Sequence, residues 1–196
     1  MRPVSAEMAA KLMAAADLIA ERGLDDTKTE DIAAVTGIPK ATIYYYFEGK
    51  EEVLSFIFGV VLDALHEAVT RAIAGPGSAA ERLARVVEAH LHVYAEYPKA
   101  SQALHFDLGR AARTPEVAKR SNESFIAPVT ALLREGAEDG SLEAIAQPRL
   151  TAIALLGMIS TAAIHLIAIE PTDPVESLAG VITPLVLDGL RARTTP

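Results

Sequence analysis

The sequence predicts an all-α fold of about nine helices. Apolar residues recur at helical spacing, as at Leu83, Val86 and His90, and no segment shows the apolar and polar alternation of a strand. Helix-breaking residues such as Gly75 and Pro76 divide the chain into helix-length segments. We expect helices at residues 5–22, 29–36, 39–46, 51–74, 78–95, 99–112, 115–138, 148–169 and 174–191.

The segment at residues 27–54, called here the helix-turn-helix segment, is predicted to form two helices joined by a tight turn. Thr27 and Glu30 fit a capping box at the start of the first helix. Gly37 follows that helix, and a glycine there can adopt the left-handed conformation that turns the chain. Pro39 suits the start of the second helix, because its ring presets φ and its missing N–H would have no partner there.

The second of these helices is predicted to bury one face and to expose an aromatic and basic face. On a helical wheel Pro39, Ile43 and Phe47 share one sector, which we expect to be buried. A core cluster of three tyrosines is the alternative, but three consecutive tyrosines cannot all point inward on one helix. Small, aromatic, hydroxyl and ammonium groups suit a helix that lies in the major groove of DNA. The outward residues are Lys40, Ala41, Thr42, Tyr44, Tyr45 and Tyr46.

The pattern of this segment matches a known signature without a gap. The matching residues are Thr29, Ile32, Ala33, Gly37, Ile38, Thr42, Ile43, Tyr44, Tyr46, Phe47, Lys50, Glu51 and Leu54. They resemble the N-terminal signature of the tetracycline-repressor (TetR) family of bacterial transcription regulators. The resemblance implies that Lys40, Ala41 and Tyr45 face bases. It also implies that phosphates are held by Thr29, Thr42, Tyr44, Tyr46 and Lys50. Lys28 departs from the family, in which many members have a second Thr.

Length and charge fit a small regulator with an N-terminal DNA-binding domain at residues 1–50 and an effector-binding and dimerisation domain at residues 51–196. The net charge is −8, and residues 1–50 hold six Lys or Arg against eight Asp or Glu. DNA affinity depends largely on cations that meet phosphates. Binding is therefore expected to depend on the local placement of Lys28, Lys40 and Lys50, and to be modest on random sequences.

The middle helices are expected to enclose a site for a small effector. Each of these residue types is more often found in an ordinary core than in a binding site, so the prediction is made for the group of residues and not for any one of them. Its mainly apolar character, with a few hydroxyl and imidazole groups, suggests an uncharged or amphiphilic effector. The expected lining residues are His90, Tyr94, Phe106, Phe125, Val129, Met158, Thr161 and His165.

The last two helices are expected to form a dimer interface. The helix at 174–191 carries a stripe of Leu178, Val181, Ile182 and Leu185. Two such helices from each subunit would pack as a four-helix bundle, which the family resemblance also implies. A two-fold dimer would place two recognition helices about 34–36 Å apart, matching successive major grooves of a palindromic operator.

Other classes of protein find little support in the sequence. Nucleophile motifs and phosphate-binding loops are absent, so neither an enzyme nor a cofactor is expected. His90 and His92 lie two residues apart on a helix and point in different directions, so no metal is expected. Residues 151–169 carry no formal charge but are expected to form a buried helix rather than a membrane span. The start lacks a signal-peptide cleavage pattern, which indicates a cytoplasmic protein.

The sequence is thus interpreted as a homodimeric repressor that a small, largely apolar effector releases from a palindromic operator. Two alternatives stay open. A structural DNA-binding protein of the same fold would need no effector, and a helical small-molecule carrier would have lost DNA binding.

Overall fold

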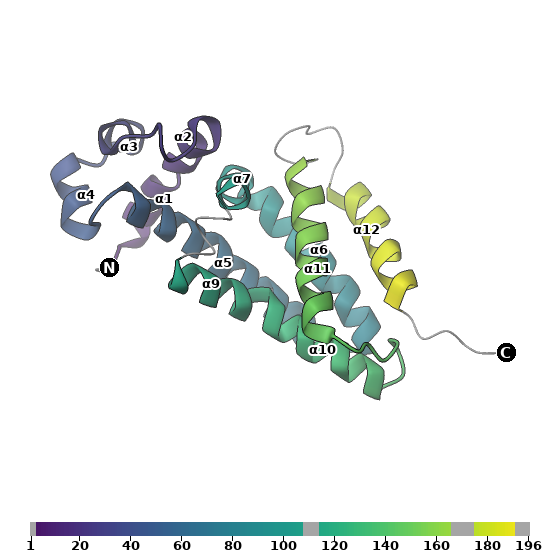
Figure 1. The fold of residues 1–196 in the computed structure, drawn as a ribbon. Coiled ribbons are helices and arrows are strands. Elements are labelled where there is room, and N and C mark those ends of the chain that lie inside the picture. The colour runs from purple at the N-terminus through teal and green to yellow at the C-terminus, as the bar shows by residue number, and fades with distance from the viewer. Residues whose placement is uncertain (1–2, 108–113, 166–174, 191–196) are drawn as a thin grey trace. The chain divides into compact units, whose positions relative to one another are not determined.

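The computed structural model describes residues 3–107, 114–165 and 175–190, and every regular element within these ranges is a helix. Figure 1 shows these helices in chain order. The all-α fold class predicted from the sequence is therefore confirmed. The chain divides into two compact units, with Met1–Val61 and Lys99–Ala118 in the first and Leu62–Pro98 and Lys119–Pro196 in the second.

The first unit begins with four short helices around an apolar core. They are α1 (Ala6–Leu12), α2 (Ala15–Arg22), α3 (Thr29–Thr36) and α4 (Lys40–Tyr46). The single helix predicted at 5–22 is wrong, because the N–H of Ala14 bonds the carbonyl of Lys11, three residues back, at 3.1 Å. This tighter turn separates α1 from α2. The largest fully buried side chains here include Leu12, Ile32, Ile43 and Phe47.

Helix α5 (Lys50–Ala74) runs from the first unit into the second. The domain boundary predicted after residue 50 falls at its first turn. Among the described helices it is the one long and apolar enough to cross a membrane by length and composition. A core helix passes the same test, and α5 buries Ile57, Phe58 and Val69 almost completely. From Lys99 onward the first unit also contains α7 (Pro98–Phe106). The sequence predicted this helix at 99–112, and residues 108–112 of the prediction lie outside the described residues.

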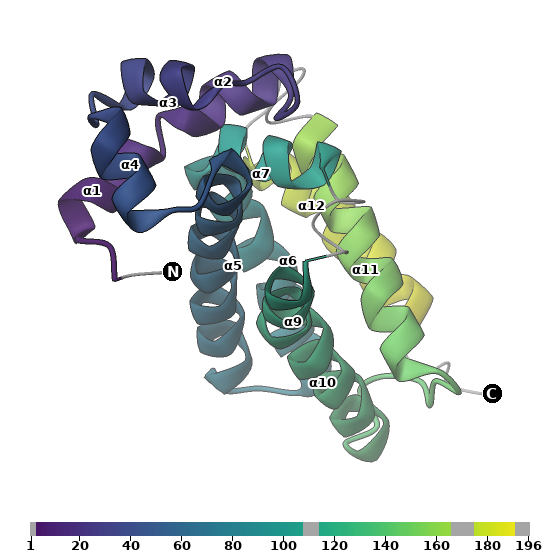
Figure 2. The ribbon, with the colours of Figure 1, turned by 60° about the vertical axis from the view of Figure 1, so that its left-hand side comes forward.

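The second unit is built around α6 (Ala79–Glu96), which packs against three other helices: α10 (Ala127–Glu138), α11 (Pro148–Ala163) and α12 (Val175–Leu190). A capping box starts α6, since the N–H of Ser78 bonds the Glu81 carboxylate at 2.8 Å and the Ser78 hydroxyl accepts the N–H of Glu81 at 3.3 Å. Figures 1 and 2 both show α11 and α12 side by side.

The helix predicted at 115–138 is continuous but not uniform. Helix α9 (Pro115–Ser121) leads into a π-helical segment, Asn122–Ile126, and then into α10. The α11 segment predicted at 148–169 is a 16-residue helix, and residues 166–169 of the prediction lie outside the described residues. Residues 174 and 191 of the last predicted helix also lie outside them.

Candidate DNA interface and effector site

The turn between α3 and α4 is closed by one glycine and one threonine. Gly37 has a φ of 66° and a left-handed conformation, as predicted. The Thr36 hydroxyl donates to the carbonyl of Ile32 at 2.7 Å and accepts the N–H of Ile38 at 3.3 Å. The second bond satisfies the N–H of Ile38 after the end of α3, and the two bonds together hold the turn that leads into α4.

The start of α3 differs from the prediction in its cap, although the helix begins at Thr29 as expected. The Thr27 hydroxyl donates to the carbonyl of Gly23 at 2.7 Å, and Glu30 pairs with Lys40 instead of reaching back. The capping box predicted from Thr27 and Glu30 is therefore wrong. Asp31 takes the carboxylate role, because its Oδ2 accepts the N–H of Lys28 at 3.0 Å.

Helix α4 separates a buried face from an exposed aromatic face. Ile43 and Phe47 are buried, and the Phe47 ring meets Phe56 edge to face at 5.7 Å. Pro39 is exposed, so its predicted place in the buried sector is wrong: it stands before the first turn of α4 as the N-cap. Tyr45 is 60% exposed, and its ring meets Tyr46 edge to face at 5.0 Å.

The predicted DNA-contacting residues fall into three groups by exposure. Lys28, Lys40, Ala41, Tyr44 and Tyr45 are exposed, while Thr42 and Tyr46 are half-buried at the edges of the α4 face. Thr29 is buried at the first position of α3, so its side chain offers little surface to a phosphate. The exposed set on α4 is an apolar, aromatic and cationic surface that can meet base edges and phosphates.

Lys40 is already engaged by a carboxylate. Its ammonium pairs with Glu30 on α3 and lies 5.6 Å from the centre of the Tyr44 ring. The hydrogen bond to Lys40 lowers the pKa of Glu30, and the same bond raises the pKa of Lys40. Both side chains keep about half of their surface exposed, so a phosphate can compete with Glu30 for the ammonium.

Lys50 is held by the backbone rather than presented to solvent. Its Nζ donates to the carbonyls of Leu24, Asp25 and Thr27 at 2.7, 3.0 and 2.9 Å. An ammonium has three N–H donors, so all of them are used in this arrangement. The structure does not support the predicted phosphate contact by Lys50, because the side chain ties the start of α5 to the connection between α2 and α3.

A buried polar chain lies in the second unit, where α6 and α11 pack together. The Tyr94 hydroxyl donates to the Ser160 hydroxyl at 3.1 Å, and Ser160 Oγ lies 3.2 Å from His90 Nε2. His90 is fully buried, with ring centroids 4.8 Å from Tyr94 and 5.1 Å from Phe125. Burial lowers the pKa of His90 to about 3, so the imidazole is neutral.

The hydrogen-bond pattern indicates which His90 nitrogen carries the proton. Ser160 accepts the Tyr94 proton, and its own proton is then available for His90 Nε2. We assign the tautomer in which Ser160 donates to Nε2 and the imidazole proton lies on Nδ1. Among the described residues, none forms a hydrogen bond with Nδ1. A buried donor without a partner is costly, and a bound molecule with an acceptor group would satisfy it.

The other predicted effector-lining residues do not form one set. Phe125 and Val129 are buried in the second unit, and Met158 is half-buried. Thr161 on α11 and His165, which follows the end of α11, are both exposed, so their predicted place in an interior lining is wrong.

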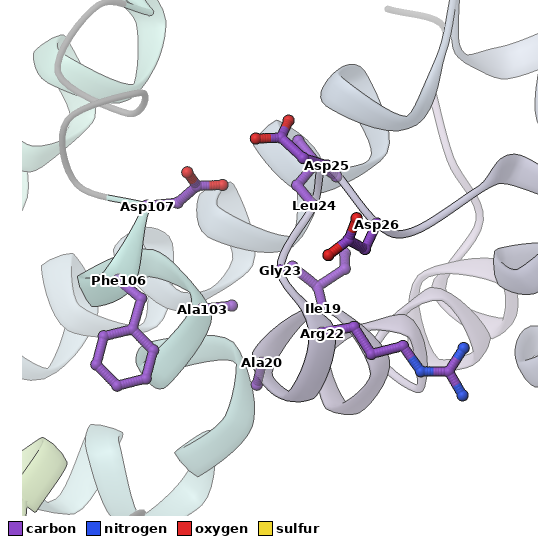
Figure 3. Close-up of a pocket in the computed structure, with 10 residues that line it drawn as sticks. All are labelled: Ile19, Ala20, Arg22, Gly23, Leu24, Asp25, Asp26, Ala103, Phe106 and Asp107. Atoms are coloured by element: carbon purple, nitrogen blue, oxygen red, sulfur yellow. The ribbon is translucent and has the colours of Figure 1, made fainter.

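Phe106 lies in the first unit beside a cleft of about 290 Å³, which Figure 3 shows in close-up. Its side chain is 61% exposed and its ring points away from the cleft, so it does not join the buried polar chain. The cleft is lined by the end of α2, the α2–α3 connection and α7, and it includes the acidic residues Asp25, Asp26 and Asp107.

Two family models match most of the chain. Residues 12–55 match the model of the bacterial regulatory proteins, tetR family, and residues 76–164 match the Tetracyclin repressor-like, C-terminal domain. The chain belongs to the TetR family. Regulators of this family are ligand-responsive DNA-binding repressors rather than enzymes, and they form dimers.

Similar proteins span the whole TetR-family plan. The Fatty acid metabolism regulator protein of Bacillus subtilis is 23% identical over 180 residues, which cover 90% of this chain and 92% of that protein. The structure of PfmR, a TetR family transcriptional regulator from Thermus thermophilus, is 26% identical with a TM-score of 0.78 and covers 93% of this chain and 99% of its own. The ketosteroid transcriptional regulator KstR2 of Mycobacterium tuberculosis is 21% identical with a TM-score of 0.80, covering 97% and 98%.

The predicted dimer stripe of this TetR-family chain is divided by the structure. Leu178 and Ile182 are buried on the side of α12 that packs in its own unit, so they offer little surface to a partner chain. Val181 and Leu185 are 67% and 64% exposed. A second exposed apolar row runs along α11, and it includes Leu150 and Ile153.

Sequence reasoning missed Ser160 and Glu30. Ser160 and its partner Tyr94 are 66 residues apart in the sequence, so no local pattern indicates the bond. Glu30 and Lys40 are ten residues apart on different helices, and the sharp turn at Gly37 brings them together. Within the described part of the chain, no group of three His, Cys, Asp or Glu residues could hold a metal ion.

Proposed function

We propose that this TetR-family regulator is a homodimeric repressor that binds a palindromic operator and leaves it when a largely apolar effector binds the second unit. The exposed α4 face carries the DNA part of the proposal. Tyr45 and Ala41 lie at its centre and are assigned to bases, with Lys40 beside them. Lys28, Thr42, Tyr44 and Tyr46 surround this centre and are assigned to phosphates.

The exposed apolar rows of α11 and α12 support the proposed dimer. Val181 and Leu185 on α12 and Leu150 and Ile153 on α11 leave large apolar side chains in solvent in the isolated chain. Pairing these rows across a two-fold axis would remove them from water in a four-helix bundle. Gly157 and Gly180 have open space where a Cβ would stand, which allows a partner helix to approach closely.

The orphaned Nδ1 of His90 supports an effector with a hydrogen-bond acceptor and an apolar body. A neutral imidazole donates well to an ester, thioester or ketone oxygen, and the adjacent Phe125 ring favours hydrocarbon. Because the relative from Bacillus subtilis is a fatty acid metabolism regulator, we place fatty acids and fatty acyl thioesters first among the candidates. Binding of such a molecule would weaken operator binding by as much as the operator weakens effector binding.

Selection of duplexes from a random library by the purified protein tests the DNA part. We expect the selected duplexes to share one palindromic sequence. The proposed location of the protein is the bacterial cytoplasm, where the chromosome lies. Recovery of no preferred sequence would favour the structural DNA-binding protein or the carrier, the two alternatives.

Release from the selected duplex tests the effector part. Fatty acids and their thioesters of increasing chain length are added to the bound complex, and the fraction bound is measured by fluorescence anisotropy. A His90→Leu variant should keep operator binding and need a higher concentration of the same compound for release. If the whole panel leaves the complex intact, the acyl class is wrong while the operator result stands.

A further inference from the structure

The connection between α2 and α3, residues 23–28, is held by side-chain hydrogen bonds and one backbone turn. The Thr27 hydroxyl bonds the carbonyl of Gly23 at 2.7 Å, and the N–H of Thr27 bonds the carbonyl of Leu24 at 3.1 Å. The Lys50 ammonium donates hydrogen bonds to the carbonyls of Leu24, Asp25 and Thr27. Thr27 is fully buried, so this network has one fixed geometry.

A lysine in this position satisfies three carbonyls of the connection that follows α2. An ammonium that bonds several carbonyls makes charge-assisted hydrogen bonds. If Lys50 turned to a phosphate, it would leave three carbonyls without this donor. A phosphate contact would therefore replace three hydrogen bonds of the ammonium with one, and we expect no net gain in free energy from it.

We propose that Lys50 is a positioning residue for DNA binding: it acts through the α2–α3 connection and does not itself neutralise a phosphate. The connection leads directly into Thr29, the first residue of α3, and α3 packs against α4. Lys50 is also the first residue of α5. The three bonds therefore set where α3 begins relative to the start of α5, and α4 is carried with α3.

The test uses Lys50→Met and Lys50→Arg in the full-length protein with its selected operator. Methionine keeps an apolar stem and removes the ammonium. Arginine keeps the charge, but its planar guanidinium cannot aim at three converging carbonyls as an ammonium does. Operator affinity is measured by anisotropy over a range of salt concentrations, below the unfolding temperature of every variant.

Both variants are expected to bind the operator about tenfold or more weakly than the unchanged protein. The slope of log affinity against log salt is expected to stay the same, because no phosphate contact is lost. Lys28→Met is the positive control and should reduce that slope by about one. Lys119→Met in the second unit is the matched neutral control.

Three results would overturn the proposal. A smaller slope for Lys50→Met, with restoration by Lys50→Arg, would assign a phosphate contact to Lys50. Wild-type affinity for Lys50→Met would show that the network does not matter for binding.

If the Lys50 variants do not fold, the Thr27→Val variant tests the proposal instead, since it removes the bond to Gly23 and leaves the lysine charge. Weaker binding with an unchanged slope supports positioning, and unchanged affinity refutes it.

Discussion

The buried imidazole of His90 predicts a specific loss of stability in mild acid. Burial lowers the pKa of His90 to about 3 in the folded protein, whereas an unfolded histidine titrates near 6.5. Below pH 6.5 the unfolded chain therefore binds a proton that the folded chain refuses. The contribution of neutral His90 is complete above about pH 6.5 and is lost progressively as the pH falls toward about 3. At pH 5 the loss amounts to about 2 kcal/mol.

The measurement compares the unchanged protein with His90→Gln, whose amide can keep a bond to Ser160 without titrating. Urea unfolding followed by circular dichroism at about pH 7 and pH 5 gives the free energy of unfolding of each. All other residues are the same in both proteins, so their contribution cancels in the difference. We expect the unchanged protein to lose about 2 kcal/mol more than the variant over this interval. An equal loss in both proteins would mean that His90 protonates in the folded state, and the assignment of a neutral donor would fail.

Three further predictions concern DNA binding and assembly. Glu30→Gln frees Lys40 for phosphates, so affinity for random duplex should rise severalfold and its salt slope should increase by about one; an unchanged slope would show that Lys40 does not contact a phosphate. Tyr45→Ala should reduce discrimination between the selected operator and single-base variants by about 1–3 kcal/mol, and a uniform loss on all sequences would refute base reading. Replacing Val181 and Leu185 by Glu should shift the protein to a monomer in sedimentation and weaken operator binding, whereas a stable dimer would move the interface elsewhere.

Local sequence patterns determine the parts of this structure that depend on neighbours along the chain. The buried and exposed faces of α4 follow from helical periodicity, which correctly predicts that Ile43 and Phe47 are buried and that Tyr45 is exposed. The turn follows from Gly37, because a left-handed residue is needed there. These features are settled within about ten residues of chain, and a single sequence contains that information.

The parts that sequence reasoning missed depend on distant contacts. Lys50 fits a charged DNA contact by its residue type, but its partners are carbonyls 23 to 26 residues earlier, and carbonyls leave no mark in a sequence. Periodicity selected Leu178 and Val181 as one apolar stripe on α12. It could not tell which edge of the stripe faces its own unit, because both edges are apolar and only packing against α6 separates them.

The bonds of Lys50 also bear on the construction of hybrid biosensors. Exchange of DNA-binding domains between TetR-family proteins is most simply attempted by joining the chains at the start of the long helix. A junction at Gly49 would take the residue at position 50 from one parent and the α2–α3 connection, residues 23–28, from the other. The side chain at position 50 would then not be matched to the three carbonyls that Lys50 bonds here. A junction one or two turns into α5 would transfer Lys50 together with residues 23–28. The transferable cassette thus ends inside α5, beyond the last residue of the domain that reads DNA.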